Sequence, residues 1–312
     1  MIISLGRLFV EIPKIDYYPC EQSSTSMNSG IKKNGTAVQD TQSSQTFSGQ
    51  SSDTEKEAGC GGLPDYQFAE RVPEYLREGY DALMRREGRR AIEMWKSLYE
   101  RFPSAEVCGH LARAYYYQIY FLGHDGDHPK HIDHIREMRR WAERALCLNC
   151  NSSIGHVMLA GALGRESQLS GSLKEIIRSA WQVRHHAERA IEIDNNWIGH
   201  YILAMWHREL ASLNPGVRAV VQILNGRKIP RGTYEESIHH FEEVLEIFPN
   251  NNVVYAEMAC TYYEMGDLVK AREVYRKCLA APMFRHPIAP CFIEKIRKRF
   301  DSIFLVDEPS LT

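Results

Sequence analysis

The feature that most constrains the fold of this 312-residue chain is a paired helical pattern near its C-terminal end. In "YAEMACTYYEMGDLVKAREVYRKCLAAP", residues 255–282, aromatic residues recur at Tyr255, Tyr262 and Tyr275. Gly266 stands where a helix would end in a left-handed residue. Two short helices joined by a tight turn are typical of repeats of about 34 residues, in which successive helix pairs stack on one another.

Small residues in the same stretch predict close helix packing. Ala259, Ala271 and Cys278 lie at positions where the two helices would approach each other, and the aromatic residues would fill the space between neighbouring pairs. This stretch carries no reactive motif. Its regular spacing therefore indicates that the chain holds other molecules through the shape of a helical scaffold.

The pattern recurs upstream and predicts an all-α fold. "WAERALCLNCN" and "HAERAIEIDNN" match each other closely, and "TYEESIHHFEEVLEIFPNN" has the form of a second helix of a pair. After Val72 we predict no strand. We predict a tetratricopeptide-like α-solenoid of four to five helix pairs at residues 73–103, 104–150, 152–195, 197–249 and 251–282, with a closing helix near residues 290–300.

Two segments interrupt this array. Residues 123–131 lengthen the turn of the second pair, and residues 212–233 separate the two helices of the fourth pair. The second segment combines an apolar stripe with basic residues such as Arg218 and Arg227. We expect it to pack over one face of the solenoid; contact with a membrane or a partner is the alternative.

The composition divides the chain into three parts. Residues 1–71 are rich in Ser, Thr, Gln and Gly and contain few large apolar residues, so we predict a disordered tail there, with phosphorylation or a plain spacer role as alternatives. We assign residues 72–302 to the helical repeat domain and residues 303–312 to a C-terminal tail.

Charge and cysteine usage narrow the class of protein further. A formal net charge of -2 gives no basic footprint for nucleic acid, so we expect no nucleic-acid partner. No apolar run reaches the roughly 18 residues that a membrane-spanning helix needs, so we expect no transmembrane segment. The eight cysteines are scattered, which favours a reducing, cytoplasmic compartment in which residues such as Cys147 serve in the core.

Candidate binding residues follow from the face that the first helix of each pair would turn toward a groove. A groove with aromatic residues and a few polar groups suits a peptide, an extended tail or a lipid chain; packing between helices is the alternative. Arg136, Arg139 and Arg140 form a basic run that could meet an acidic partner, although a solvated helix face explains it better. The predicted groove residues are Arg113, Tyr116, Tyr117, Tyr120, His200, Tyr201, His207, Tyr263 and Glu264.

A histidine-rich segment supplies weak metal-ligand candidates. His124, His128 and His131 lie at spacings that can place imidazoles on one face, but no neighbouring glutamate provides the base of a hydrolytic zinc site. A polar loop at the end of a helix is the favoured interpretation. The two adjacent His–His pairs point about 100° apart on a helix, so neither pair alone converges on one ion. No phosphate-binding or nucleophile motif occurs, so we expect neither an enzyme nor a cofactor.

One family resembles this chain in the order and spacing of its segments. The helix "KEIIRSAWQVRHHAERAIEID" is followed by "IGHYILAMWHREL", then by the basic and apolar insertion, then by "TYEESIHHFEEV". Over residues 73–300 this order resembles the regulator of microtubule dynamics family. The resemblance implies an interaction module without catalytic activity, associated with microtubules and the spindle. It also implies that one branch tethers endoplasmic reticulum to mitochondria and binds phospholipid.

Three functional hypotheses follow. The first is a cytoplasmic protein that binds microtubules, tubulin or other protein partners at the cytoskeleton or spindle. The second is a module that binds phospholipid in its groove at an organelle contact, with association at the mitochondrial surface. The third is a metal-dependent enzyme built on the histidine-rich segment, which we consider the weakest of the three.

Overall fold

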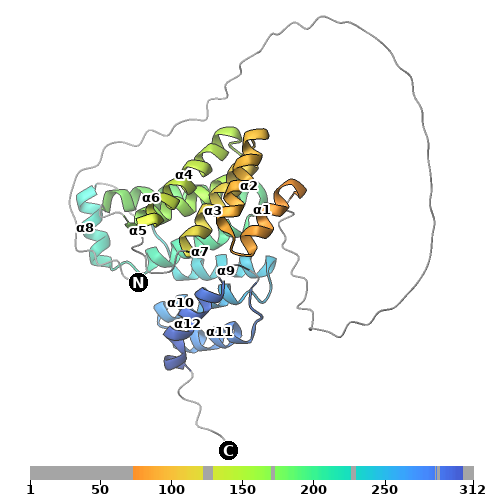
Figure 1. Ribbon diagram of the computed structural model, residues 1–312. Coiled ribbons are helices and arrows are strands. Elements are labelled where there is room, and N and C mark those ends of the chain that lie inside the picture. Colours follow the sequence, from red (N-terminus) through yellow and green to blue (C-terminus); the bar gives the residue numbers. More distant parts are fainter. Residues whose placement is uncertain are drawn as a thin grey trace, which may run out of the picture. The chain divides into compact units, whose positions relative to one another are not determined.

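The computed structural model describes residues 73–121, 129–169, 173–225, 230–284, 286 and 289–304 (Figure 1). Every helix or strand assigned within these residues is an α-helix, which confirms the all-α prediction. The predicted N-terminal tail, residues 1–71, lies outside this part of the chain. The last described helix continues to Phe304, so it includes the first two residues of the predicted C-terminal tail.

The helices pair as the repeat pattern predicts. Each of five pairs consists of two antiparallel neighbours, and the helices of a pair pack against each other. The pairs are α1 (Glu74–Met84) with α2 (Gly88–Arg101), α3 (Ala105–Phe121) with α4 (Pro129–Leu148), α5 (Ser153–Leu169) with α6 (Leu173–Asp194), α7 (Trp197–Ala211) with α9 (Tyr234–Ile247), and α10 (Asn252–Met265) with α11 (Leu268–Ala280).

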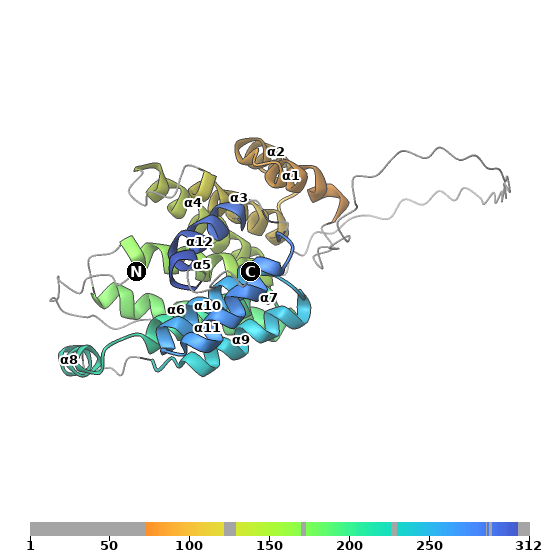
Figure 2. The ribbon, with the colours of Figure 1, turned by 90° about the horizontal axis from the view of Figure 1, so that it is seen from below.

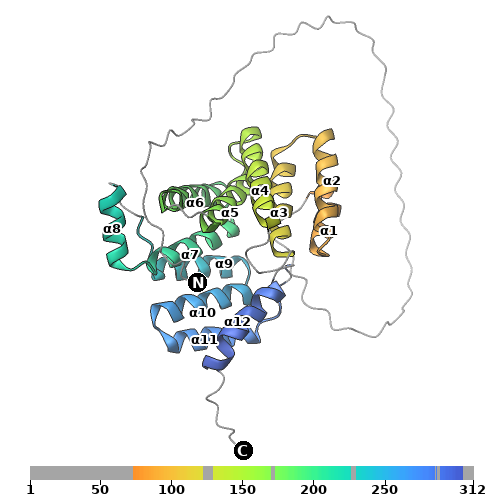
Figure 3. The ribbon, with the colours of Figure 1, turned by 60° about the vertical axis from the view of Figure 1, so that its left-hand side comes forward.

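Two further helices complete the described array. The predicted insertion in the fourth pair contains α8 (Pro215–Asn225), which lies to the side of the helix pairs in all three views (Figures 1, 2 and 3). The predicted closing helix is α12 (Ala289–Phe304), which packs against α10. The insertion therefore leaves the pairing of α7 with α9 intact.

Local sequence signals explain where several helices begin and end. The side chains of Asn196, Thr233 and Asn251 accept hydrogen bonds from backbone N–H groups in the first turns of α7, α9 and α10. Gly266 has φ 88° after α10, as predicted, and its N–H donates to the carbonyl of Tyr263. These caps replace hydrogen bonds that the helix ends would otherwise lack.

Small residues let the helices approach closely. Ala259, Ala271 and Cys278 are buried between α10 and α11, which confirms the predicted packing of the fifth pair. Gly199 has the same role between α6 and α7, because a Cβ there would lie 2.9 Å from Ile191 Cγ1 and 3.0 Å from the carbonyl oxygen of Ala187. Close contact at these positions fixes the spacing of neighbouring helices.

The first helices of successive pairs form one continuous layer. Helix α3 packs on α5, α5 on α7, and α10 on both α9 and α12. Each second helix, α2, α4, α6, α9 or α11, packs against the first helix of its own pair, and Figure 2 shows the same array from below. None of the helices in the described ranges is both long and apolar enough to span a membrane.

One core prediction is wrong. Cys147 is exposed in the last turn of α4, beside Leu148, which is also exposed. The helical spacing continues to the end of α4, but no neighbouring helix covers these last residues. By contrast, Cys108, Cys260 and Cys278 are buried as expected, and burial raises the pKa of each thiol.

Candidate functional site

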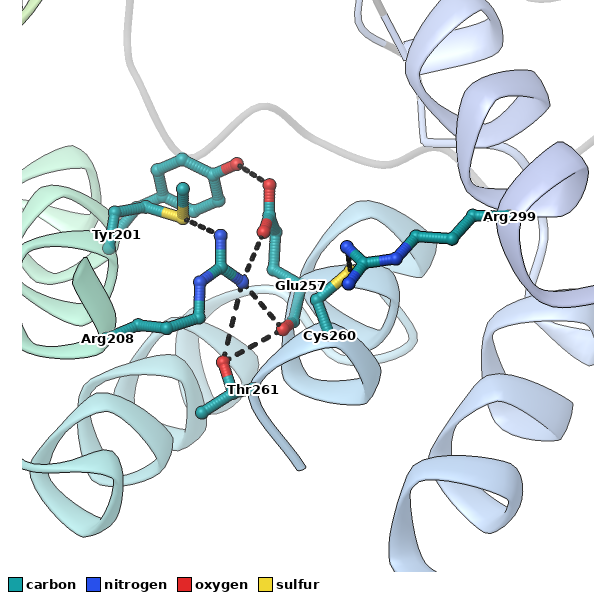
Figure 4. Close-up of polar contacts among 7 residues, drawn as sticks. Tyr201, Arg208, Glu257, Cys260, Thr261 and Arg299 are labelled. Carbon is teal, nitrogen blue, oxygen red and sulfur yellow. Dashed lines mark hydrogen bonds and ion pairs between the residues drawn. The ribbon is translucent and has the colours of Figure 1, made fainter. Parts of the chain in front are cut away.

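Polar side chains from α7 and α10 meet within the layer of first helices (Figure 4). The Arg208 guanidinium lies 2.6 Å from Glu257 Oε2, and the Tyr201 hydroxyl donates to Glu257 Oε1 at 3.2 Å. The side chains of Arg208 and Glu257 are only 7% and 6% exposed. We call Tyr201, Arg208 and Glu257 the central polar cluster.

Further hydrogen bonds hold Arg208 in this cluster. Its Nη1 donates to the main-chain oxygen of Glu257 at 3.0 Å and to Thr261 Oγ1 at 3.5 Å, and its Nη2 lies 3.2 Å from Met205 Sδ. Burial by itself disfavours the charged guanidinium, but the carboxylate of Glu257 raises the pKa of Arg208 well above its ordinary value. Arg208 therefore stays charged, and its ion pair with Glu257 offsets the cost of burying the two side chains.

The tyrosines near this cluster are hydrogen-bond donors rather than acids. Burial, and then the charge of Glu257, raise the pKa of Tyr201 well above its ordinary value. Burial also raises the pKa of Tyr116 on α3, with Arg165 opposing the rise and Glu257 adding to it. Because Tyr116 feels the charge of Glu257 on α10, the second and fifth pairs come close together, which requires the layer of first helices to curve.

A second contact joins the same two regions. The Tyr117 hydroxyl on α3 forms a hydrogen bond with His286, in the connection between α11 and α12. Their rings pack edge to face with centroids 4.9 Å apart. Near the fifth pair, Arg299 of α12 lies over the Tyr263 ring and donates to Cys260 Sγ at 3.8 Å. The C-terminal residues therefore cover part of the face on which the predicted groove residues lie.

The structure brings some of the predicted groove residues together and separates others. Arg113, Tyr116 and Tyr117 share α3 and are buried or half-buried there. His200 and His207 on α7 face α9, so they lie away from the central polar cluster. Glu264 is exposed at the end of α10. The side chain of Tyr120 lies outside the described part of the structure.

The predicted metal-ligand candidates also lie outside it. His124 and His128 are not among the described residues, and only the backbone of His131, in α4, is described. A different group of metal-ligand residues occurs in the described part: His207, Glu236 and His240 present ligand atoms that all lie within 4.8 Å of one another. Spacing within a single segment did not reveal this group, because its ligands come from two helices, α7 and α9.

Arg208 and Glu257 were missed for a similar reason. Each is a charged residue inside an apolar helical stretch, "MWHRELA" and "YAEMAC", and that signal was available in the sequence. Charged residues at positions where a helix should be buried are almost always paired. The partner could not be assigned, because 49 residues separate the two members of the pair.

The basic run on α4 is neutralised by its neighbours. Arg136 pairs with Asp133, Arg140 pairs with Glu137, and Arg139 pairs with both Glu143 and Glu166. These contacts agree with the solvated, ion-paired face that the sequence favoured. A hollow of about 430 Å³ opens beside Arg139 between α4, α5 and α6. Positively and negatively charged side chains line it, together with apolar residues such as Ile132 and Leu169.

The stacked pairs define the class of this protein as a helical repeat protein of the tetratricopeptide type. The crystal structure of a thermophilic TPR protein from Thermus thermophilus superimposes with a TM-score of 0.52 at 14% identity, covering 74% of this chain and 98% of that one. MamA gives a TM-score of 0.38 at 14% identity, covering 75% of this chain and 96% of its own. YrrB, described as a TPR protein with an unusual peptide-binding site, gives a TM-score of 0.38 at 14% identity, covering 71% of this chain and 89% of that one.

The family is narrower than this class. The family model described as regulator of microtubule dynamics protein 1-3 matches residues 75–286, which is more than half of the chain. The chain belongs to this family, as its segment order predicted. No curated protein matches the chain. The family and the fold together support a helical repeat interaction protein.

Proposed function

We propose that this chain is a non-catalytic adaptor that binds microtubules and acts at the cytoskeleton or spindle. The observation that carries this proposal is membership of the regulator of microtubule dynamics family over residues 75–286. In this proposal the helical repeat supplies a rigid scaffold for protein partners, and residues 1–71 serve as a tail that partners or kinases reach.

The chemistry of the described residues supports an adaptor without catalysis. Burial raises the pKa of the Cys260 and Cys278 thiols to about 12, so both are poor nucleophiles at neutral pH. The charged members of the central polar cluster, Arg208 and Glu257, bind each other and are shielded from solvent. A scaffold role needs a rigid interior of this kind, and it needs no reactive group.

Co-sedimentation of the full chain with taxol-stabilised microtubules tests the proposal. We expect the protein to pellet with microtubules and to be released as salt rises, because tubulin presents an acidic surface whose attraction salt screens. A charge-reversed variant of the α4 run, Arg136→Glu with Arg140→Glu, asks whether that face contributes. Failure to pellet at any salt concentration would contradict microtubule binding.

The second candidate is phospholipid binding at an organelle contact, including the mitochondrial surface. It is favoured by the tyrosines and arginines that the first helices turn toward one another, such as Tyr116 and Arg165, since phenols and guanidinium groups suit a phosphate headgroup. Mass spectrometry of lipids extracted from the purified full chain tests it. Co-purifying phospholipid in stoichiometric amount supports this candidate, and its absence with intact microtubule binding favours the first one.

A further inference from the structure

A chain of hydrogen bonds fixes the ring of His240 on α9. His200 Nε2 lies 3.0 Å from Asn195 Oδ1, which can only accept, so His200 donates from Nε2 and carries its lone pair on Nδ1. His240 Nδ1 lies 3.1 Å from His200 Nδ1 and must therefore be the donor. The lone pair of a neutral His240 is then on Nε2, where it is free to bind a ligand.

Two more donors lie near His240. Ligand atoms of His207 on α7, of Glu236 on α9 and of His240 lie within 4.8 Å of one another. Glu236 and His240 are four residues apart on α9 and therefore share one face of that helix. His207 Nδ1 accepts from the N–H of Thr233 at 3.4 Å, which is a long hydrogen bond that a metal bond could replace.

This donor set fits a metal ion of a particular kind. Two imidazole nitrogens and one carboxylate oxygen match the ligands that Zn²⁺ takes in three-ligand protein sites, where water fills the fourth position. Calcium and magnesium prefer sites made only of oxygen. The hydrogen bond from His240 Nδ1 to His200 can orient the His240 ring, in the place where metal-binding histidines usually donate to a carboxylate, a carbonyl or water.

We propose that His207, Glu236 and His240 bind a divalent transition-metal ion of the zinc type. His207 lies shortly before the segment that contains α8, and Glu236 lies shortly after it. An ion held by both residues ties α7 to α9 where this insertion leaves and rejoins the fourth pair. We therefore also infer that the metal restrains α8 and the described residues that flank it, 212–214 and 230–233.

The third pair supplies a comparison within the same chain. His156 and His186 repeat the paired histidines, with His156 Nε2 donating to the Cys150 carbonyl at 3.0 Å and the two Nδ1 atoms 2.9 Å apart. Leu163 lies seven residues after His156, where the fourth pair has His207. Gln182 lies four residues before His186, where the fourth pair has Glu236. In the third pair only His186 corresponds to a ligand of the fourth pair, and the other two positions carry no metal ligand.

Zinc titration of the metal-stripped full chain tests the proposal. His207→Leu and Glu236→Gln give the fourth pair the residues of the third. We expect the tightest Zn²⁺ equivalent, followed by calorimetry, to weaken by about 100-fold or more in either variant, since even outer-shell changes cost about 10–100-fold. Co²⁺ should show visible absorption with the unchanged chain only, and Mg²⁺ should not compete.

Two control variants locate the ion. His186→Gln changes the third pair, and His128→Ala changes the histidine-rich segment; both should retain the tight Zn²⁺ equivalent. Circular dichroism checks that each variant keeps its helices, and Glu236→Gln, at an exposed position, keeps the test decisive if His207→Leu does not fold. Unchanged affinity in Glu236→Gln, or loss of the ion in either control, would overturn the assignment.

Limited proteolysis tests the consequence for the insertion. Trypsin can cut after Arg218 in α8 or after Arg231, which is exposed shortly before α9. We expect Zn²⁺ to slow this cleavage severalfold in the unchanged chain and to have no effect in Glu236→Gln. Equal cleavage rates with and without Zn²⁺, in a chain shown to bind the ion, would overturn the inference that the metal restrains α8 and the described residues that flank it.

Discussion

The third and fourth helix pairs use the same scaffold for different interiors. In each pair a glycine and a histidine lie in the first turn of the first helix, Gly155–His156 and Gly199–His200. The histidine forms a hydrogen bond with a histidine on the second helix, His186 or His240. Burial, the larger cause, and neighbouring histidines lower the pKa of His186 to about 3 and that of His240 to about 4. Both histidine pairs therefore stay neutral at physiological pH.

The residues of the two pairs differ about two helical turns after these histidines, along the first helix of each pair. At matching positions the third pair has Leu163 and Gly164, and the fourth pair has His207 and Arg208. The fourth pair also carries the α8 insertion between its helices. The repeat therefore sets where the helices lie, and single polar residues on them create clusters that a neighbouring pair lacks.

The largest expected effect comes from breaking the central polar cluster. Glu257→Gln leaves the buried Arg208 charge without its counterion, so we expect the free energy of unfolding to fall by about 3–5 kcal/mol. Urea unfolding measures it. Replacing both partners with methionine should cost much less, because no buried charge remains. If Glu257→Gln lowers the free energy of unfolding by less than about 1 kcal/mol, the Arg208–Glu257 ion pair is not an important difference between the fourth and third helix pairs.

The next effect is acid sensitivity of the third pair. Below pH 6.5 the unfolded chain protonates His186, while the folded chain, with a pKa of about 3, does not. The contribution of neutral His186 to the free energy of unfolding is complete above pH 6.5. It is lost as pH falls toward 3, at up to about 1.4 kcal/mol per pH unit. The free energy of unfolding, measured with denaturant at several pH values between 7 and 5, should change less steeply with pH in His186→Gln than in the unchanged chain. An unchanged slope would contradict burial of the neutral ring beside His156 and His185.

A smaller effect on stability distinguishes two glycines, one in a crowded position and one in an open position. Gly199→Ala places a methyl 3.0 Å from a backbone oxygen that cannot move easily, so we expect a loss of about 1–3 kcal/mol. Gly164→Ala meets only Val183 Cγ2 at 3.9 Å and should be neutral or stabilising by up to about 1 kcal/mol. Thermal unfolding of the two variants measures the difference. Equal melting temperatures would mean that the packing of α6 on α7 adapts.

The smallest effect concerns the orientation of the proposed metal ligand. Asn195 has φ 52°, so Asn195→Gly removes its Oδ1 while keeping a residue suited to that conformation. His200 then loses its acceptor, and we expect Zn²⁺ to bind up to about tenfold more weakly, at the low end of outer-shell effects. Calorimetry measures it. A larger loss than that of Glu236→Gln would contradict the ligand assignment.

The repeat pattern predicted the fold closely because it is local. Helix lengths follow from the spacing of apolar residues, and helix ends follow from residues such as Gly266 and Thr233, so five pairs and the insertion were located from the sequence. The exposure of Cys147 could not be predicted in this way. Whether a helix end is covered depends on the neighbouring helix and not on its own periodicity.

The sequence by itself determined the helices, their pairing and the family of this protein, since these depend on residues within about 40 positions of one another. Only the tertiary structure decided which side chains meet. The stacking of the fifth pair on the fourth brings Arg208 to Glu257, and the curvature of the layer of first helices brings Tyr117 to His286. The return of the chain after α8 brings His207 to His240. Curvature accumulates from small rotations between pairs, and no single repeat encodes it.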